Sequence, residues 1–310
     1  MEQVEHEEKA TRRQGADDNA DVTPTARAQV QIHVCVVLWG FTAILGKLIT
    51  LPALPLVWWR MLIVVATLLL MPPVWRGLRS MQFAFMARFA GVGVVVALHW
   101  LAFYGAIKLA NASVAASCIG LAPVFLAFIE PYLTRRRFDP RELLVGVAVV
   151  PGVVLVAGGV PGSMQTGVAV GVLSAALIAV GSALNKRYID QGKPLAITGL
   201  ELGGGLAALT LIAPIVSGMA VFSPPGPRDA TLLMALALGC TLFPYALSLA
   251  ALRHLSAFAS QLAVNLEPVY AIVIAALLLG ERRELHAMFY AGVAIILGAV
   301  FAHPILVGRR

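Results

Sequence analysis

The chain has 310 residues, of which 59% are hydrophobic and 13% are charged, and its net charge at pH 7 is +7. A soluble domain carries about a quarter charged residues, and a chain this apolar would expose more apolar surface than one core can bury. The composition therefore excludes a soluble enzyme, a disordered protein and a disulfide-stabilised scaffold. It favours a polytopic membrane protein.

Residues 1–30 form a polar segment with seven acidic and four basic side chains and no apolar run. A signal peptide requires an apolar run of about 7–15 residues, so we interpret this segment as a flexible, solvated tail. The remaining bases lie in short gaps between apolar runs. Nucleic-acid-binding proteins instead gather bases on one soluble face, so no nucleic-acid partner is expected.

Ten apolar stretches follow the tail, each long enough, at about 20 residues, to cross the ~30 Å hydrocarbon layer of a bilayer. Backbone groups must be paired within lipid, and no alternating β-barrel pattern occurs, so each stretch is predicted to be a helix. The expected fold class is all-α, a polytopic membrane protein with ten transmembrane helices. The predicted spans are 31–50, 56–74, 88–107, 112–133, 142–160, 167–187, 195–216, 230–250, 256–279 and 287–307.

The distribution of bases predicts the orientation. With the tail in the cytoplasm, seventeen of the 23 Lys and Arg residues fall on the cytoplasmic side and six on the opposite side. Basic residues are enriched in cytoplasmic loops, and an even number of spans returns the chain to the side where it started. We therefore expect a multi-pass protein of the bacterial inner membrane with both termini in the cytoplasm.

The two halves of the chain resemble each other. Five spans per half is an odd number, so the second copy would enter the membrane in the opposite sense, which is typical of transporters with a midplane binding site. The expected organisation is the tail, a first repeat at 31–160 and a second at 161–310. The matches pair Lys47 with Lys186, Pro55 with Pro194, Lys108 with Arg253, Pro123 with Pro268, and Gly146 with Gly292.

Several short motifs in register carry a family resemblance. They are Leu38-Trp39-Gly40 with Lys47, Trp59-Arg60, Ala110–Ala116 leading to Leu121-Ala122-Pro123, Leu266-Glu267-Pro268-Val269, and Leu279-Gly280-Glu281. Over about residues 31–305 the sequence resembles the EamA-type members of the drug/metabolite transporter superfamily. The resemblance implies ten helices in a 5+5 inverted repeat and export or exchange of small metabolites, often amino acids, through a central cavity. The first half departs from the pattern where Arg135-Arg136 replaces the Gly-Glu ending.

Aromatic and polar residues cluster at midplane depth. His99 and Trp100 lie in the third span with Tyr104 one turn on, Tyr245 occupies the corresponding depth in the eighth, and Trp39 lies at similar depth in the first. An aromatic lining around a polar group suits an aromatic amino acid or an organic cation. The alternative is that the tryptophans pack between helices and His99 bonds a neighbouring backbone group. His99 also has a suitable intrinsic pKa for carrying a coupling proton.

Span 9 offers two amides on one helix face, Gln261 and Asn265, which could bind a solute or bond another helix. On a continuous helix Glu267 would point some 200° from Asn265, so it is expected to face away from the cavity as a structural partner or a proton site. Arg60, near the end of span 2, is expected to snorkel towards the interface, with carboxylate binding as the alternative.

Three further features are predicted to be structural or mechanical. Glu130 is expected to form an ion pair with Arg135–Arg137, whereas Glu201 is left open between a structural and a functional role. Pro123 and Pro268 are predicted to kink their helices and to act as hinges, or else to be static breaks. Small residues predict close packing at Gly167, Gly171 and Ala175 and at Gly199 and Gly203. Cys35, Cys118 and Cys240 lie in separate spans without disulfide or metal spacing, so they are predicted to be buried residues.

The leading hypothesis is a secondary transporter of small organic metabolites, plausibly amino acids with aromatic ones favoured, working by alternating access. Its partners would be the solute and the bilayer, with protons as a candidate coupling ion. A drug or organic-cation exporter of the same fold is the first alternative. A membrane-embedded enzyme is the second, although no HExxH, nucleophile or Walker motif occurs, and no catalytic residue, metal or cofactor is expected.

Overall fold

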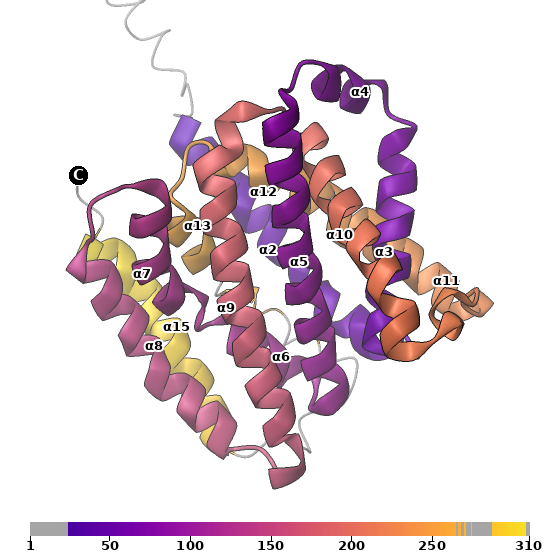
Figure 1. Cartoon of the computed structure of the whole chain (residues 1–310). Coiled ribbons are helices and arrows are strands. Elements are labelled where there is room, and N and C mark those ends of the chain that lie inside the picture. Colours follow the sequence, from indigo (N-terminus) through magenta and orange to yellow (C-terminus); the bar gives the residue numbers. More distant parts are fainter. Residues whose placement is uncertain (1–23, 265, 268–269, 271–273, 275–286, 308–310) are drawn as a thin grey trace, which may run out of the picture.

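A computed structural model describes residues 24–264, 266, 267, 270, 274 and 287–307 (Figure 1). Within these residues all regular secondary structure is helical, which confirms the predicted all-α class. Each of the ten predicted spans coincides with one or more helices, and the ninth is described only in part. Three cysteines, Cys35, Cys118 and Cys240, are buried as predicted.

The helices of the first half are α2 (Pro24–Leu48), α3 (Ala53–Leu69), α4 (Pro72–Arg79), α5 (Phe83–Leu109), α6 (Ala112–Ile119), α7 (Ala122–Thr134) and α8 (Pro140–Gly158). The second half contains α9 (Gln165–Tyr188), α10 (Pro194–Ser217), α11 (Pro227–Met234), α12 (Phe243–Leu252), α13 (Ala257–Val264) and α15 (Ala287–Val307). Short 3-10 turns are η1 (Gly162–Met164), η2 (Ile189–Gln191) and η3 (Met219–Phe222), whereas η4 (Ala235–Leu242) is a π-helix.

Six helical segments of the described residues are long and apolar enough to cross a membrane, and a seventh is the bent pair of α3 and α4. The two helices of this pair meet at 83°, because α4 begins at two prolines that cannot continue the hydrogen-bond ladder of α3. The α4 helix carries Trp75, Arg76 and Arg79 on its exposed surface. It lies across one end of the bundle (Figure 1).

Glycines allow α5 to lie close to α10. A Cβ on Gly93 would lie 1.8 Å from the carbonyl oxygen of Glu201, and one on Gly204 would lie 2.4 Å from that of Ala90. The predicted contact at Gly203 is wrong, since that position faces open space and the adjacent Gly204 and Gly205 make the contact. The face at Gly167 and Gly171 is confirmed, because a Cβ there would meet Ala110 or Cys118.

Both halves contain a short helix at the same register. The α6 and α13 helices have eight residues each and start 145 positions apart, at Ala112 and Ala257. Their starts are capped alike, by Asn111 accepting from the Val114 amide and by Ser256 accepting from the Ala259 amide. The predicted break near Pro123 is confirmed, because α6 ends at Ile119 and α7 begins at Ala122. Pro268 lies outside the described residues, and a hinge role for either proline stays a prediction.

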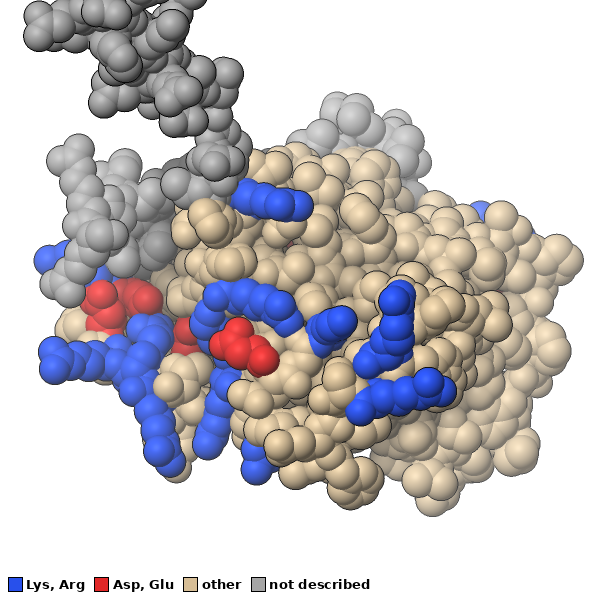
Figure 2. All heavy atoms as spheres, turned by 90° about the horizontal axis from the view of Figure 1, so that it is seen from above, with Lys and Arg blue, Asp and Glu red and all other residues tan. Residues whose placement is uncertain are grey.

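One end of the bundle gathers bases from distant parts of the sequence. Lys186 donates to the carbonyl of Leu252 at 2.7 Å, Arg253 donates to that of Gly192, and the Arg88 guanidinium lies 5.4 Å from the Tyr188 ring centroid. Figure 2 shows an end view of the molecule on which Lys and Arg outnumber Asp and Glu. These bases belong to the set expected in the cytoplasm. Which side of the membrane this end faces stays a prediction.

Candidate functional site

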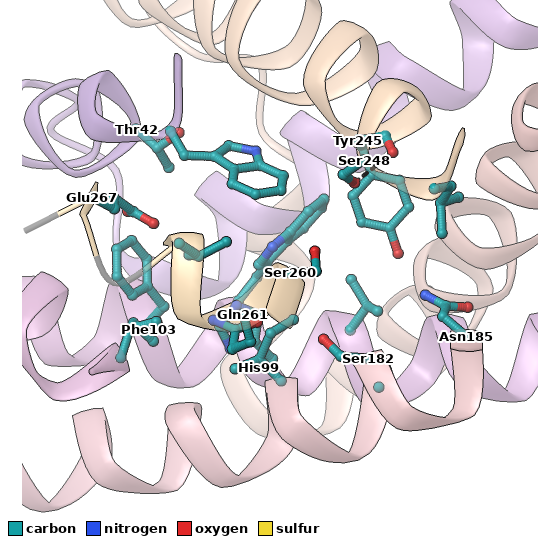
Figure 3. Close-up of a pocket in the computed structure, with 18 of the residues that line it drawn as sticks. Thr42, His99, Phe103, Ser182, Asn185, Tyr245, Ser248, Ser260, Gln261 and Glu267 are labelled. Atoms are coloured by element: carbon teal, nitrogen blue, oxygen red, sulfur yellow. Dashed lines mark hydrogen bonds between the residues drawn. The ribbon is translucent and has the colours of Figure 1, made fainter. Parts of the chain in front are cut away.

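A central cavity lies between helices of both halves (Figure 3). Its volume is about 120 Å³, and it lies within a wider space of about 940 Å³ that includes open solvent. Its wall is mostly apolar and aromatic with a few polar groups. Lining residues include Trp39 and Thr42 of α2, Arg60 of α3, His99, Trp100 and Phe103 of α5, Ser182 and Asn185 of α9, Tyr245 and Ser248 of α12, Ser260 and Gln261 of α13, and Glu267.

Arg60 is buried beside this cavity, with 2% of its surface exposed, so the prediction that it snorkels to the interface is wrong. Its Nε donates to Thr241 Oγ1 at 2.6 Å and its Nη1 to Tyr104 Oη at 2.7 Å. These bonds hold the head group inwards because Tyr104 and Thr241 lie on the neighbouring α5 and η4. No ion pair joins Arg60 to a carboxylate among the described residues, and no hydrogen bond there uses Nη2.

The Trp100 ring stacks against one face of the Arg60 guanidinium. The Cζ atom of Arg60 lies 3.8 Å from the Trp100 ring centroid, which is a close cation–π geometry. The Tyr245 ring meets Trp100 edge to face at 6.2 Å. Trp39, Trp100 and Tyr245 therefore lie on the cavity wall, where the sequence placed them, and their part in solute binding stays a prediction.

Tyr104 does not line this cavity, contrary to expectation. Its side chain is fully buried against Gly46 of α2, and its hydroxyl accepts from Arg60. The sequence spacing of one turn after Trp100 gives the correct depth. It does not give the side of α5 on which the ring lies, which here is behind Arg60.

His99 lines the cavity and also bonds a neighbouring backbone group, so both interpretations of the sequence apply to it. Its Nδ1 lies 2.9 Å from the carbonyl oxygen of Ser174 and 2.9 Å from the Ser174 hydroxyl, and the ring also lines the cavity. Ser174 in turn donates to the His99 carbonyl at 3.1 Å. The reciprocal bonds fix the ring at the junction of α5 and α9. A role for His99 in carrying protons stays a prediction.

Gln261 and Glu267 both line the cavity, so the expectation that Glu267 faces away from it is wrong. That expectation assumed a continuous helix, whereas α13 ends at Val264 and a turn at Leu266 precedes Glu267. Figure 3 shows Glu267 near Phe103, at the opposite side of the cavity from Tyr245 and Asn185. Buried Gln261 Nε2 and Thr42 Oγ1 have no hydrogen-bond partner among the described residues. Asn265 lies outside them.

A polar cluster behind the wall joins Glu201 to two lining residues. Glu201 is fully buried, and its Oε2 accepts from the Tyr245 hydroxyl and from Asn185 Nδ2, the latter at 3.4 Å. Sequence reasoning left Glu201 open and missed Asn185. One signal was present: Arg60 to Tyr104 and Glu201 to Tyr245 have the same separation of 44 residues.

The π-helix η4 was not foreseen, and neither was Thr241 within it. The Thr241 hydroxyl donates to the Leu236 carbonyl at 2.6 Å, five residues back, while it accepts from Arg60. Such wide turns occur often at functional sites. Nothing in the apolar sequence of this segment distinguishes a π-helix from an α-helix.

Glu130 forms the expected ion pair, with Arg136 Nη2 at 3.4 Å. It also accepts from the backbone amides of Ala257 and Phe258 at 2.9 and 2.7 Å. These contacts cap the start of α13 with a side chain of α7, so the two halves are joined at the end that carries the bases.

Comparisons with known proteins agree with this architecture. The sequence model of the EamA-like transporter family matches the chain twice, over residues 28–158 and 165–302. A comparison with curated proteins gives no match. Among 25 matching solved chains, one titled "Crystal structure of protein" has a TM-score of 0.67 at 17% identity, covering 90% of this chain and 96% of that chain. This likeness shows the fold alone.

Proposed function

Because the chain belongs to the EamA-like transporter family, we propose that it exports or exchanges amino acids, aromatic ones favoured, by alternating access through the central cavity. Members of this family are transporters and not enzymes, and the apolar helices make this an integral multi-pass membrane protein. The proposal includes the bacterial inner membrane as its location, with both termini in the cytoplasm.

The observation that carries the proposal is the buried Arg60. Among the described residues no carboxylate lies at ion-pair distance from this buried guanidinium, although Glu267 on the same wall offsets part of its charge. An anionic group in direct contact with the guanidinium would offset more of the cost of burying it. Nε and Nη1 are used by the protein, and Nη2 is left for a ligand. A carboxylate is the natural acceptor, because charge-assisted hydrogen bonds to guanidinium are about twice as strong as neutral ones.

The rest of an amino acid has partners on the same wall. Glu267 supplies a carboxyl group for the ammonium, and Gln261 Nε2 is a buried donor without a partner in the described chain. Trp39, Trp100 and Tyr245 offer aromatic surface to an apolar or aromatic side chain. The cavity thus presents a cation, an acid and aromatic rings, which match the three parts of the solute.

An organic cation is the second candidate. The aromatic wall and Glu267 favour it, since cations bind over aromatic rings. The positive charge of Arg60 argues against an organic cation, because it would repel a second cation in the same low-dielectric cavity. The two candidates therefore differ in their response to removal of the Arg60 charge.

Transport in proteoliposomes tests the proposal. We expect the purified protein to exchange labelled L-phenylalanine or L-tryptophan and not to transport tetraethylammonium, a hydrophilic organic cation that crosses a protein-free bilayer poorly. Arg60→Gln should reduce amino-acid exchange more than tenfold, while Arg141→Gln, an exposed arginine far from the cavity, should leave it unchanged. Transport of the organic cation that rises in Arg60→Gln would support the second candidate, and no transport of any amino acid would contradict the first.

A further inference from the structure

Glu201 lies behind the wall of the central cavity and accepts hydrogen bonds from two residues of that wall, Tyr245 and Asn185. Tyr245 and Asn185 line the cavity, whereas Glu201 is fully buried behind them on α10. A buried carboxylate requires either a cation or a proton to offset its charge. Within the described residues no basic side chain forms an ion pair with Glu201, so a cation of the protein does not meet this requirement.

Charged and titratable groups on the surrounding helices are engaged elsewhere. Arg60 on α3 bonds Tyr104 and Thr241, and His99 on α5 bonds Ser174. Gly93 of α5 packs against the backbone of Glu201. Glu267 is buried on the wall of the same cavity, on the side opposite Tyr245 and Asn185. Other basic groups lie towards the ends: Arg76 and Arg79 exposed on α4, Arg88 against Tyr188, Lys108 on the carbonyls of Gly46 and Ile49, Lys186 on that of Leu252, Arg187 by Tyr188, and Arg253 on the carbonyl of Gly192.

Two buried oxygens of the cluster have no hydrogen-bond partner among the described residues. They are Oε1 of Glu201 and Oδ1 of Asn185. An unsatisfied buried polar atom costs about 1–3 kcal/mol, and a proton on the carboxyl group would provide a donor where only acceptors remain. A sodium ion would need several more oxygen ligands than these two residues supply.

The neighbours of Glu201 can bond it in both protonation states. The Tyr245 hydroxyl can donate or accept, and the Asn185 amide presents a donor or, turned by 180°, an acceptor. Charged Glu201 can accept from both groups in the arrangement that the structure shows. Neutral Glu201 can donate its proton to the turned amide and still accept from Tyr245. Lysine or arginine in these positions would favour the charged form alone.

We propose that Glu201 binds a coupling proton and that Tyr245 transmits its protonation state to the solute in the cavity. A hydronium ion transfers its proton to a lone pair of the carboxylate oxygen: one O–H bond of hydronium breaks, one O–H bond of the carboxyl group forms, and a water molecule is left. The charged form accepts strong bonds from the Tyr245 hydroxyl and the Asn185 amide. The neutral form turns the amide and accepts a weaker bond from Tyr245, so the Tyr245 hydroxyl is more easily drawn to a solute. Tyr245 also packs on Trp100, and Trp100 stacks on the Arg60 guanidinium. A movement of Tyr245 on protonation of Glu201 would therefore reach the proposed carboxylate site at Arg60. This inference rests on the transport function proposed above.

A measurement without solute tests the proton site itself. Infrared difference spectra between acidic and alkaline buffer should contain the band of a buried protonated carboxyl group in the wild type. Glu201→Gln should lose one component of that band. Glu267→Gln, which removes the other carboxyl group at the cavity, and Asp190→Asn, which removes an exposed carboxylate from η2, should keep this component. An unchanged band in Glu201→Gln would overturn the proposal. If this component is lost but no amino acid is transported, the proposed solute fails and the proton site stands.

Flux under a pH gradient tests the coupling. Net flux of L-phenylalanine from proteoliposomes should depend on an imposed pH gradient in the wild type and in Asp190→Asn. In Glu201→Gln this dependence should be lost while exchange of L-phenylalanine without a gradient is retained. Tyr245→Phe keeps the acid and removes the hydroxyl, so it should weaken the dependence even if Glu201→Gln does not fold. Equal dependence in wild type and both variants, or dependence on a sodium gradient instead, would overturn the proposal.

Discussion

Contacts with three neighbouring side chains fix the position of the Arg60 guanidinium beside the cavity. Its planar head group bonds two hydroxyl oxygens from different helices and rests on the Trp100 ring. These contacts remove most of its rotational freedom before a ligand arrives, which lowers the entropic cost of binding. Lysine has a single ammonium group and cannot reproduce this combination of stacking and forked bonding.

The contact between the Trp100 ring and the Arg60 guanidinium can be tested by substitution of Trp100. Trp100→Ala should weaken L-phenylalanine exchange about tenfold, since a desolvated cation–π contact is worth about 1–2 kcal/mol. Trp100→Phe, which keeps an aromatic face, should retain most of the activity. The control is Trp75→Ala on α4, at the end of the bundle. We would measure initial exchange rates together with the folded fraction in detergent, and equal rates in Trp100→Ala and wild type would remove Trp100 from the site.

Helix breaks determine which residues reach the cavity. On a continuous span 9, Gln261 and Glu267 would point about 120° apart. Both line the cavity, and α13 ends at Val264 between them. The break in the first half, between Ile119 and Ala122, occurs at the matching register. The proline of the sequence motif thus indicated that a break exists. It did not indicate which side chains the break would redirect.

The close packing of α5 on α10 at Gly204 can be tested by adding a methyl group there. Gly204→Ala places a Cβ against the backbone of Ala90, and such overpacking typically costs about 1–3 kcal/mol. Gly203→Ala is the matched control on the adjacent position, which faces open space. It should be neutral or stabilising by up to about 1 kcal/mol, because alanine favours helix. Thermal unfolding in detergent should separate the two variants, and equal melting temperatures would contradict the described helix contact.

At the scale of the whole molecule, hydropathy and charge were sufficient to predict the helical class and the positions of the spans. The length of an apolar stretch and the positions of Lys and Arg are properties of single segments, and they can be read directly from the sequence. The site depends on contacts between segments far apart. Arg60 with Thr241 and Glu201 with Tyr245 join residues separated by 181 and 44 positions, and no periodicity predicts such pairs. A cavity near the midplane, with Arg60 and Glu267 as candidate site residues, could therefore be predicted, while the contacts that place both side chains on one cavity wall could not.

Orientation in the membrane is the remaining property of the whole molecule, and it can be tested at the two ends of the bundle. Asp190 and Arg228 are both exposed, the first in η2 near the basic end and the second at the start of α11 on the opposite side of the predicted membrane. Since Cys35, Cys118 and Cys240 are buried, they should give little background with a thiol reagent. We expect a membrane-impermeant maleimide to label Arg228→Cys in intact cells and Asp190→Cys only in inverted vesicles, because bases are retained on the cytoplasmic side. The reverse pattern would invert the assigned topology, and labelling of both variants from one side would contradict an odd number of crossings between these positions.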